Sequence, residues 1–445
     1  MIHGAQVWDR PCMRRFEDIY VAVWCFVMQM TGTLLIPFIQ GTIPAYMLAL
    51  GSTAIVFLKI RSWNVPPIVV RYLISFSIFL ALWLLLLGGS QLGLLLSDRR
   101  DFGLVYMVDP IDNTIVLRST LFTQSLYLLC CVLIALYFRY FFQEKWMRYI
   151  FWSAYFLALY GLYEWLFFLV THESGDFLVN RTFFGGHTAS WSQTMSFGGI
   201  DLLRIKSTML EPSVFAAAVI PYFFLALEHR KMVLASLLFF TAVFSTSTSC
   251  YIALVACLLI RSFWTGELRW VYLAVLVLVG IFLGSMALFY PDVFRDLFHD
   301  KLAGLNASGA GRLGDILNGL DLLSTYTVPN WIFGIGVGYA YLRVPDAILI
   351  NCGLLGLGAF LWVFCRPVFL LPITPGYGGI RTALFGILVL FAISLTEFYI
   401  PSTWMFLGLA YYKLDEYRRN QRMQARSIAP TQKPPVKEEP TPGGT

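Results

Sequence analysis

The sequence predicts an all-α polytopic membrane protein with about 12 transmembrane helices and two large loops outside the membrane. The chain has 445 residues, of which 58% are hydrophobic and only 13% are charged. Its mean hydropathy is +0.69, and apolar runs of about 15–25 residues recur along it. This composition excludes an ordinary soluble domain, and the length of the runs excludes the short alternating segments of a transmembrane barrel.

Twelve apolar runs predict the transmembrane helices. They lie near 19–39, 43–58, 72–96, 119–142, 147–170, 212–228, 232–246, 249–265, 270–290, 347–365, 382–398 and 401–414. One region is ambiguous, because residues 232–260 carry no charged side chain and also fit a single long helix. The Ser-Thr-Ser-Thr-Ser sequence at 245–249 favours two short helices joined by a tight turn, and we predict two.

The short connectors between these runs differ in charge. One set carries Lys and Arg, as at Lys59, Lys145 and Lys231, whereas the connectors near 37–42, 245–248 and 399–402 carry neither. The positive-inside rule places the basic connectors and both termini in the cytoplasm. We therefore predict a cytoplasmic N-terminus at 1–18, a transmembrane core at 19–414 and a disordered cytoplasmic tail at 415–445, which is Arg- and Gln-rich and then Pro-rich.

Three sizeable loops, near 97–118, 171–211 and 291–346, fall on the outer side. The most informative stretch is Arg-Ile-Lys-Ser-Thr-Met-Leu-Glu-Pro-Ser at 204–213, where two cations, hydroxyls and a carboxylate meet an apolar run. The planar fork of donors on arginine suits phosphate. Arg204 with Lys206, and the arginines of the two long loops, therefore predict a diphosphate or another polyanion at the outer surface. The alternative for each arginine is solvation or contact with lipid head groups.

Two interpretations of Glu211 remain open. A carboxylate directly before Pro212 suits the start of a helix, where it caps free amides and complements the helix dipole. The same carboxylate suits a general base that accepts a proton from an attacking sugar hydroxyl. A second acidic residue, Glu164, lies within a predicted span, where ionisable groups are costly and often functional. Because it is near the outer end of that span, the alternative is that it simply reaches water.

Glycines and histidines of the outer loops do not form a recognised cofactor site. The Gly-Ile-Gly-Val-Gly sequence at 334–338 lacks the Gly-Lys-Ser/Thr of a nucleotide-binding loop, and we expect it to let backbones pack closely at the membrane edge. The histidines have no metal-ligand spacing, so neither a metal nor another cofactor is expected.

The order of several motifs resembles a known family. Arg-x-Lys-Ser-Thr-x-x-Glu-Pro-Ser-x-Phe-Ala at 204–216 opens a span, and the serine-rich break follows at 245–249. Arg312, the stretch at 329–338, Asp346 and Gly-Leu-Leu-Gly at 353–356 come later. This order is similar to that of the O-antigen ligase and Wzy-type polysaccharide polymerase superfamily. The ligase branch commonly has a histidine after the glycine motif, where this chain has Asp346, and the polymerase branch is therefore favoured.

The resemblance implies a metal-independent, inverting glycosyltransferase of the bacterial inner membrane. It implies polymerisation of undecaprenyl-diphosphate-linked oligosaccharides at the periplasmic face into exopolysaccharide or O-antigen. Arg204 and Arg312 would hold the diphosphate together with Lys206 and Arg181, and Glu211 or Asp346 would be the base. Expected partners are the lipid-linked oligosaccharide, membrane lipids, a chain-length regulator and export proteins, but no nucleic acid.

Three other functions remain open from the sequence. They are ligase-type transfer of finished glycan to another acceptor, transport of the lipid-linked unit by a flippase, and a non-catalytic role in a secretion assembly. The charged residues lie in outer loops rather than at mid-membrane, which counts against transport.

Overall fold

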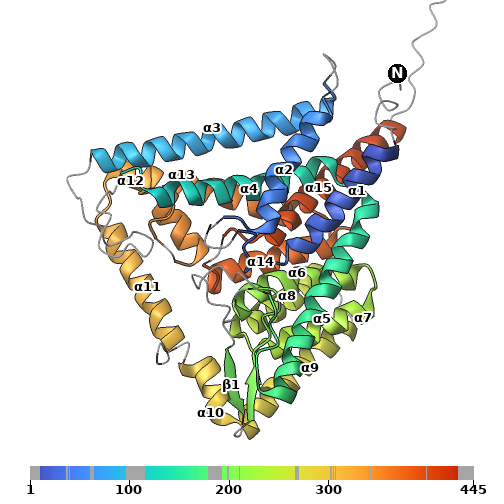
Figure 1. Ribbon diagram of the computed structural model, residues 1–445, viewed down its shortest axis with the longest axis vertical. Helices are drawn as coiled ribbons and strands as arrows, with labels where there is room; N and C mark the ends of the chain where they lie inside the picture. The colour runs from blue at the N-terminus through green and yellow to red at the C-terminus, as the bar shows by residue number, and fades with distance from the viewer. Residues whose placement is uncertain are drawn as a thin grey trace, which may run out of the picture.

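The computed structural model is mostly helical and describes the chain with several gaps (Figure 1). The described residues are 11–36, 39, 41–60, 65–96, 116–178, 193–197, 200–209, 211–265, 270–300, 303, 305, 307–340, 342–396 and 398–428. Its principal helices are α1 (Pro11–Val27), α2 (Pro44–Leu58), α3 (Pro67–Leu95), α4 (Ser119–Phe141), α5 (Met147–Thr171), α6 (Pro212–Glu228), α7 (Met232–Phe244), α8 (Thr248–Thr265), α9 (Trp270–Phe289), α13 (Val344–Leu370), α14 (Gly378–Ile393) and α15 (Pro401–Ile428).

Proline begins several of these helices for a local physical reason. It occupies the first turn of α2, α3, α6 and α13, where no intrahelical partner for an amide hydrogen exists and where its fixed φ angle suits the helix. Because most of these sequences are apolar on all sides, they are suited to the interior of a bundle or to lipid.

Each of the twelve predicted spans overlaps one of these principal helices. Among the described residues, six helices are long and apolar enough to cross a membrane, namely those at Pro67–Leu95, Ser119–Phe141, Glu144–Thr171, Thr248–Thr265, Tyr272–Phe289 and Val344–Leu370. This count is consistent with a helical, multi-pass membrane protein. The number of twelve spans remains a prediction, because α2, α6, α7 and α14 are shorter apolar helices.

The ambiguous region at 232–260 forms two helices, as predicted. Helix α7 ends at Phe244 and α8 begins at Thr248. Between them Thr246 has a φ of +46°, a left-handed conformation that interrupts helical hydrogen bonding. The serine- and threonine-rich break therefore ends one helix and starts the next.

Several predicted boundaries differ from the structure. The first helix covers Pro11–Val27 rather than 19–39, so part of the expected N-terminal segment is helical. The disorder expected from 415 is wrong for 415–428, because α15 continues to Ile428. Residues 413–425 include many charged and long-chain residues that favour a helix, and Lys413 pairs with Glu416 one turn later, 2.9 Å away. The rest of the tail lies outside the described residues.

The predicted outer loops contain regular structure, so the all-α expectation is incomplete. The loop at 171–211 includes an antiparallel hairpin of β1 (Thr194–Phe197) and β2 (Ile200–Leu203), in which Thr194 pairs with Leu203. The loop at 291–346 contains α10 (Pro291–Phe294), the π-helical turn η3 (Arg295–Asp300), α11 (Ala307–Ser324) and α12 (Val328–Phe333).

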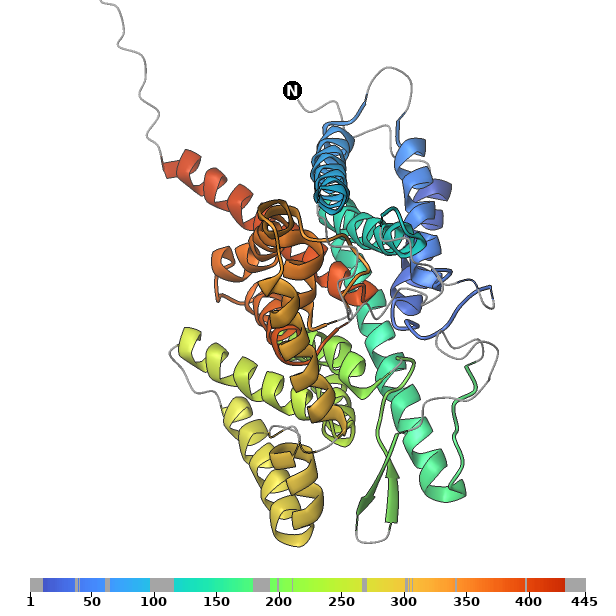
Figure 2. The ribbon, with the colours of Figure 1, turned by 90° about the vertical axis from the view of Figure 1, so that its left-hand side faces the viewer.

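These loop elements lie on one side of the molecule. In Figure 1 the helices α10, α11 and α12 and strand β1 follow the edge opposite to the corner that holds α1 and the end of α15. Figure 2 shows the hairpin projecting at the end opposite to the N-terminus. We call these the loop side and the terminal side.

Ion pairs gather the basic connectors on the terminal side. Two residues of helix α1 form ion pairs with these connectors: Glu17 lies 2.5 Å from Lys59, and Asp18 lies 2.6 Å from Lys145. The short 3₁₀ turn η2 (Glu144–Trp146) also contacts α15, because Lys413 lies 2.7 Å from Glu144. The connectors that the charge pattern grouped together thus meet in space.

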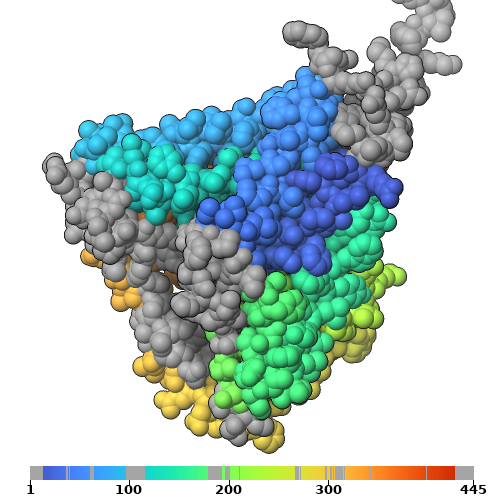
Figure 3. Space-filling view, in the orientation of Figure 1, coloured from blue at the N-terminus to red at the C-terminus, as the bar shows by residue number. Residues whose placement is uncertain are grey.

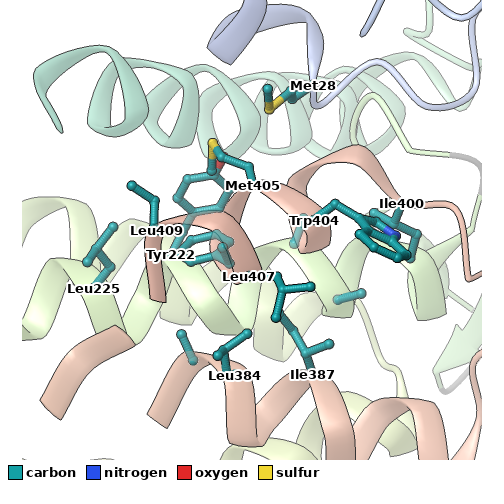
Figure 4. Close-up of a cluster of buried hydrophobic side chains, with 14 of the residues drawn as sticks. Met28, Tyr222, Leu225, Leu384, Ile387, Ile400, Trp404, Met405, Leu407 and Leu409 are labelled. Atoms are coloured by element: carbon teal, nitrogen blue, oxygen red, sulfur yellow. The ribbon is translucent and has the colours of Figure 1, made fainter. Parts of the chain in front are cut away.

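The core centres on α6, in which almost every residue is buried. Tyr222 and Leu225 of this helix face Leu384 of α14 and Met405 of α15 (Figure 4). Helix α3 is the opposite case, because most of its surface remains exposed along one edge of the molecule (Figure 3). An apolar helix exposed in this way is suited to contact with lipid.

Candidate functional site

The charged segment at 204–209 runs through the interior of the loop side. The backbone N–H of Ile205 donates to Phe244 O, at 3.2 Å, and Ile205 through Met209 are at most 2% exposed. Gly161 of α5 admits the segment, because a Cβ atom there would lie 2.8 Å from Ile205 Cγ2. The motif is therefore a packed structural element and not a surface loop.

The two hydroxyls of the motif fix its conformation. Ser207, which has a φ of +56°, donates from Oγ to Leu157 O of α5 at 2.7 Å. Thr208 donates from Oγ1 to the carbonyl of Gln29 at 2.6 Å. Since both acceptors are backbone carbonyls of other elements, these hydroxyls anchor the segment to the bundle.

Lys206 belongs to a buried cluster with two carboxylates, which we call the ion cluster. Its ammonium lies 2.8 Å from Asp176 Oδ2 and 3.2 Å from Glu164 Oε1. The lysine side chain is 2% exposed and both carboxylates are fully buried. The Tyr160 hydroxyl also donates to Asp176, at 2.9 Å. The expectation that Glu164 reaches water is therefore wrong.

This geometry changes the interpretation of Lys206. Its ammonium already has two buried anionic partners within the protein, and in this conformation a diphosphate cannot reach it. One face of α5 carries Leu157, Gly161 and Glu164, because these residues are spaced at helical intervals. The same helix therefore both anchors the segment at 204–209 and supplies a carboxylate to Lys206. Lys206 is a structural ion-pair partner here, and the prediction that it binds a diphosphate requires the cluster to open.

Arg204 lies in a different environment two residues earlier. Its Nε donates to Thr246 Oγ1 at 2.9 Å, Nη2 donates to Thr246 O at 3.1 Å, and Nη1 donates to Gln193 Oε1 at 2.7 Å. The residue is half-buried. The left-handed turn at Thr246 thus presents both a hydroxyl and a carbonyl to Arg204, which gives the serine-rich break a positioning role.

Glu211 stands at the N-cap position of α6. Its backbone is extended, its carbonyl accepts from Phe215 N at 2.9 Å, and Pro212 follows in the first turn. Its side chain makes no capping hydrogen bond to the helix backbone; instead it accepts from Ser213 Oγ at 3.0 Å. The backbone of Glu211 therefore starts the helix, while its half-buried carboxylate keeps the base interpretation open.

Asp346 forms a local ion pair in the first turn of α13. Arg343 lies 2.8 Å away through Nε and 2.7 Å away through Nη2, a two-pronged contact that charged hydrogen bonds favour. The Asp346 side chain is 41% exposed. A base there would need to exchange its contact with Arg343 for one with substrate.

The structure does not describe the side chains of the other two predicted diphosphate ligands, Arg312 and Arg181. Arg312 belongs to α11, but its side chain lies outside the part that the structure describes. Arg181 lies outside the described residues altogether.

The glycine-rich stretch lets two backbones meet, as expected. A Cβ atom on Gly334, which has a φ of +72°, would lie 2.3 Å from the backbone of Asn351. A Cβ atom on Gly353 would lie 2.4 Å from the backbone of Ile332. Gly353 also breaks α13 with a φ of +64°. No side chain larger than hydrogen fits at this crossing.

Arg118 is a buried cation that sequence reasoning missed. It is 4% exposed, donates from Nε to Thr120 Oγ1 at 2.8 Å, and lies over the Tyr339 ring. Burial lowers the pKa of Arg118 to about 10. Tyr339 is only 2% exposed, so this contact is internal to the protein. The sequence feature that could have identified Arg118 is its position as a basic residue directly before an apolar run on the outer side.

A cavity of about 920 Å³ lies between α3, α4, α13 and α15. Its walls are mainly apolar, and its loop-side end includes Val214 and Ala347. These residues belong to the first turns of α6 and α13, the helices that begin directly beside Glu211 and include Asp346. No group of three His, Cys, Asp or Glu suited to a metal occurs among the described residues.

Comparison with protein-family models, curated proteins and solved structures finds no match for this chain.

Proposed function

We propose that the protein polymerises undecaprenyl-diphosphate-linked oligosaccharide units into exopolysaccharide or O-antigen at the outer face of a bacterial inner membrane. The position of Arg204 carries this proposal. Three hydrogen bonds to uncharged groups of Gln193 and Thr246 fix its guanidinium on the loop side, where it remains half-buried.

A preset guanidinium supports glycosyl transfer because the leaving group is a diphosphate. The acceptor hydroxyl oxygen attacks the anomeric carbon, and the bond from that carbon to the diphosphate oxygen breaks. The diphosphate takes the electron pair, and a cation already in place stabilises this charge without reorganisation. The hydroxyl proton passes to Glu211 or Asp346 as general base.

The apolar cavity supports a lipid-linked donor. Its loop-side end lies next to the first turns of α6 and α13, which carry Glu211 and Asp346. A glycan that is attached to a lipid must be held with its diphosphate close to such a lipid-sized space. Ligase-type transfer uses the same donor and differs in its acceptor.

Transport of the lipid-linked unit is the second candidate. The buried ion cluster favours it, because ionisable groups inside helix bundles often mark a transport path. Glu164 lies in the loop-side half of α5, however, and its partner Lys206 belongs to the loop-side segment at 204–209, which suits an outer site better.

The glycolipids of a deletion strain separate these functions. We expect single repeat units on the lipid carrier, accessible from the periplasm. Full-length polymer on the carrier would indicate a ligase, and units confined to the cytoplasmic leaflet would contradict both enzymes and indicate a flippase.

Variants in the same strain test the residues. We expect Arg204→Ala and Arg312→Ala to abolish polymer, because each removes a cation from the diphosphate site. The matched control is Arg230→Ala, an exposed arginine in the connector after α6, which should leave polymer length unchanged. Normal chain lengths in an arginine variant that inserts normally would remove that arginine from the site.

A further inference from the structure

The terminal-side end of the cavity carries charged residues that the proposed glycosyl transfer does not use. The cavity, at about 920 Å³, is near the upper end of the range of ordinary ligand pockets. Along α4 its lining runs from Gln124 to Arg139, about 22 Å at the rise of an α-helix. Half of a bilayer's hydrocarbon core is about 15 Å thick. Lipid chains of one leaflet therefore fit the cavity lengthwise.

The cavity opens sideways between α3 and α13. Ile78 of α3 and Trp362 of α13 both line it, although their exposed fractions are 64% and 66%. Trp362 lies about two turns before the end of α13, in the half of that helix nearer the terminal side. The opening therefore faces the leaflet on the terminal side.

Arginines surround the terminal-side end. Arg139 and Arg366 line it, and their guanidinium carbons lie 4.8 Å from the Tyr411 ring centroid and 5.3 Å from the Trp362 ring centroid respectively. Asp415 pairs with Arg139 at 3.1 Å. Two arginines and one aspartate leave a formal charge of +1 at this end of the cavity.

We propose that this cavity binds an anionic glycerophospholipid from the terminal-side leaflet. Its acyl chains occupy the apolar walls, and its phosphate lies between Arg366 and Arg139. Trp362 and Tyr411 contact the head-group region, where amphipathic aromatic rings are favoured. The excess positive charge selects an anionic head group over a zwitterionic one.

The position of the charge distinguishes this lipid from a polyprenyl carrier. A carrier used at the loop side would place its diphosphate at the opposite end of the cavity, away from Arg139 and Arg366. The inference rests on the cavity and its arginines, and it holds whether or not a lipid-linked donor enters the same cavity from the loop-side end.

Native mass spectrometry of the full-length protein in neutral detergent tests this inference. The probes are phosphatidylglycerol, phosphatidylcholine with the same chains, and a polyprenyl phosphate. We expect phosphatidylglycerol to be retained about tenfold more strongly than phosphatidylcholine, the effect of one or two charge-assisted hydrogen bonds. Arg366→Ala should remove that preference and Arg366→Lys should restore part of it. Arg419→Ala, an exposed arginine on α15, should leave it unchanged.

A cavity-filling variant separates the chains from the head group. Ala359 lines the cavity, so Ala359→Trp should weaken retention of both phospholipids, with size-exclusion chromatography confirming an intact protein. Equal retention of the two phospholipids by the unmodified protein, an unchanged preference in Arg366→Ala, or an equal loss of polyprenyl phosphate retention in that variant would each overturn the proposal.

Discussion

The ion cluster on the loop side and the arginines around the cavity on the terminal side use similar residues in opposite ways. In the ion cluster two buried carboxylates hold one lysine, so the lysine charge is fully taken up by internal partners. At the terminal-side end of the cavity two arginines meet one aspartate, and the Arg139 and Asp415 side chains are 28% and 38% exposed. The first group is satisfied within the protein, whereas the second retains positive charge for a ligand.

This difference shows that a cationic motif does not identify an anion site by itself. Lys206 and Arg204 belong to the same motif, yet burial makes one an internal ion pair and leaves the other half-buried at the loop side. Carboxylates and exposure decide which cations are available to substrate.

The largest effect is expected from removing the cation of the ion cluster. Lys206→Ala leaves Glu164 and Asp176 buried without it, which should lower the free energy of unfolding by about 3–5 kcal/mol. Thermal unfolding in detergent measures this loss, with the exposed Lys231→Ala as control. Combining Lys206→Met with Glu164→Gln and Asp176→Asn should restore much of the stability, since no buried charge then remains. An unchanged melting temperature for Lys206→Ala would contradict the inference that Lys206 stabilises the buried carboxylates of the ion cluster.

A smaller effect is expected from crowding the buried segment. Gly161→Val places carbon atoms against Ile205 and Ser207, and overpacking of this kind costs about 1–3 kcal/mol. Gly358→Val is the matched control, because a Cβ atom on that helical glycine meets nothing within 4 Å. Equal melting temperatures for the two variants would show that the segment at 204–209 shifts to accommodate the larger side chain. The difference between a tightly packed loop side and a more open terminal side would then be smaller than we infer.

The partly exposed pair at the terminal side should matter little for folding. Asp415→Asn removes the partner of Arg139, and exposed pairs contribute about 0.2–1 kcal/mol. Thermal unfolding in detergent without anionic lipid should show a small change, while retention of phosphatidylglycerol should rise because one negative charge is lost. A destabilisation as large as that of Lys206→Ala would remove the distinction between the two groups.

The smallest effect concerns Asp18 and depends on pH. Burial alone would raise the pKa of this carboxyl, but hydrogen bonds from Lys145 and Trp146 outweigh it and lower the pKa below its ordinary 3.8. The pair therefore stabilises the fold above pH 3.8, and this contribution is lost as the pH falls from 3.8 through the lower folded value. Asp18→Asn should be slightly less stable than the unmodified protein at pH 7, and the difference should shrink below pH 3.8. A difference that persists there would assign the effect to packing.

Local patterns in the sequence determined the helical class, the approximate helix positions and the break between α7 and α8. Hydropathy and proline act within a few residues, so they predict where a helix begins and ends even without knowledge of its neighbours. Charge sorting also grouped the basic connectors that the structure brings together on the terminal side. The disorder predicted from 415 was wrong for 415–428, because charged residues that lower hydropathy also favour a helix.

Only the tertiary structure decided what the charged motif at 204–213 contacts. Lys206 meets Asp176 and Glu164, which lie 30 and 42 positions away in sequence, and Arg118 meets Tyr339 from a distant segment. Such contacts depend on which helices pack together, and the energy of a charge depends on the burial that this packing creates. The sequence located the motif, and the packing of α5 against it separated its buried lysine from its half-buried arginine.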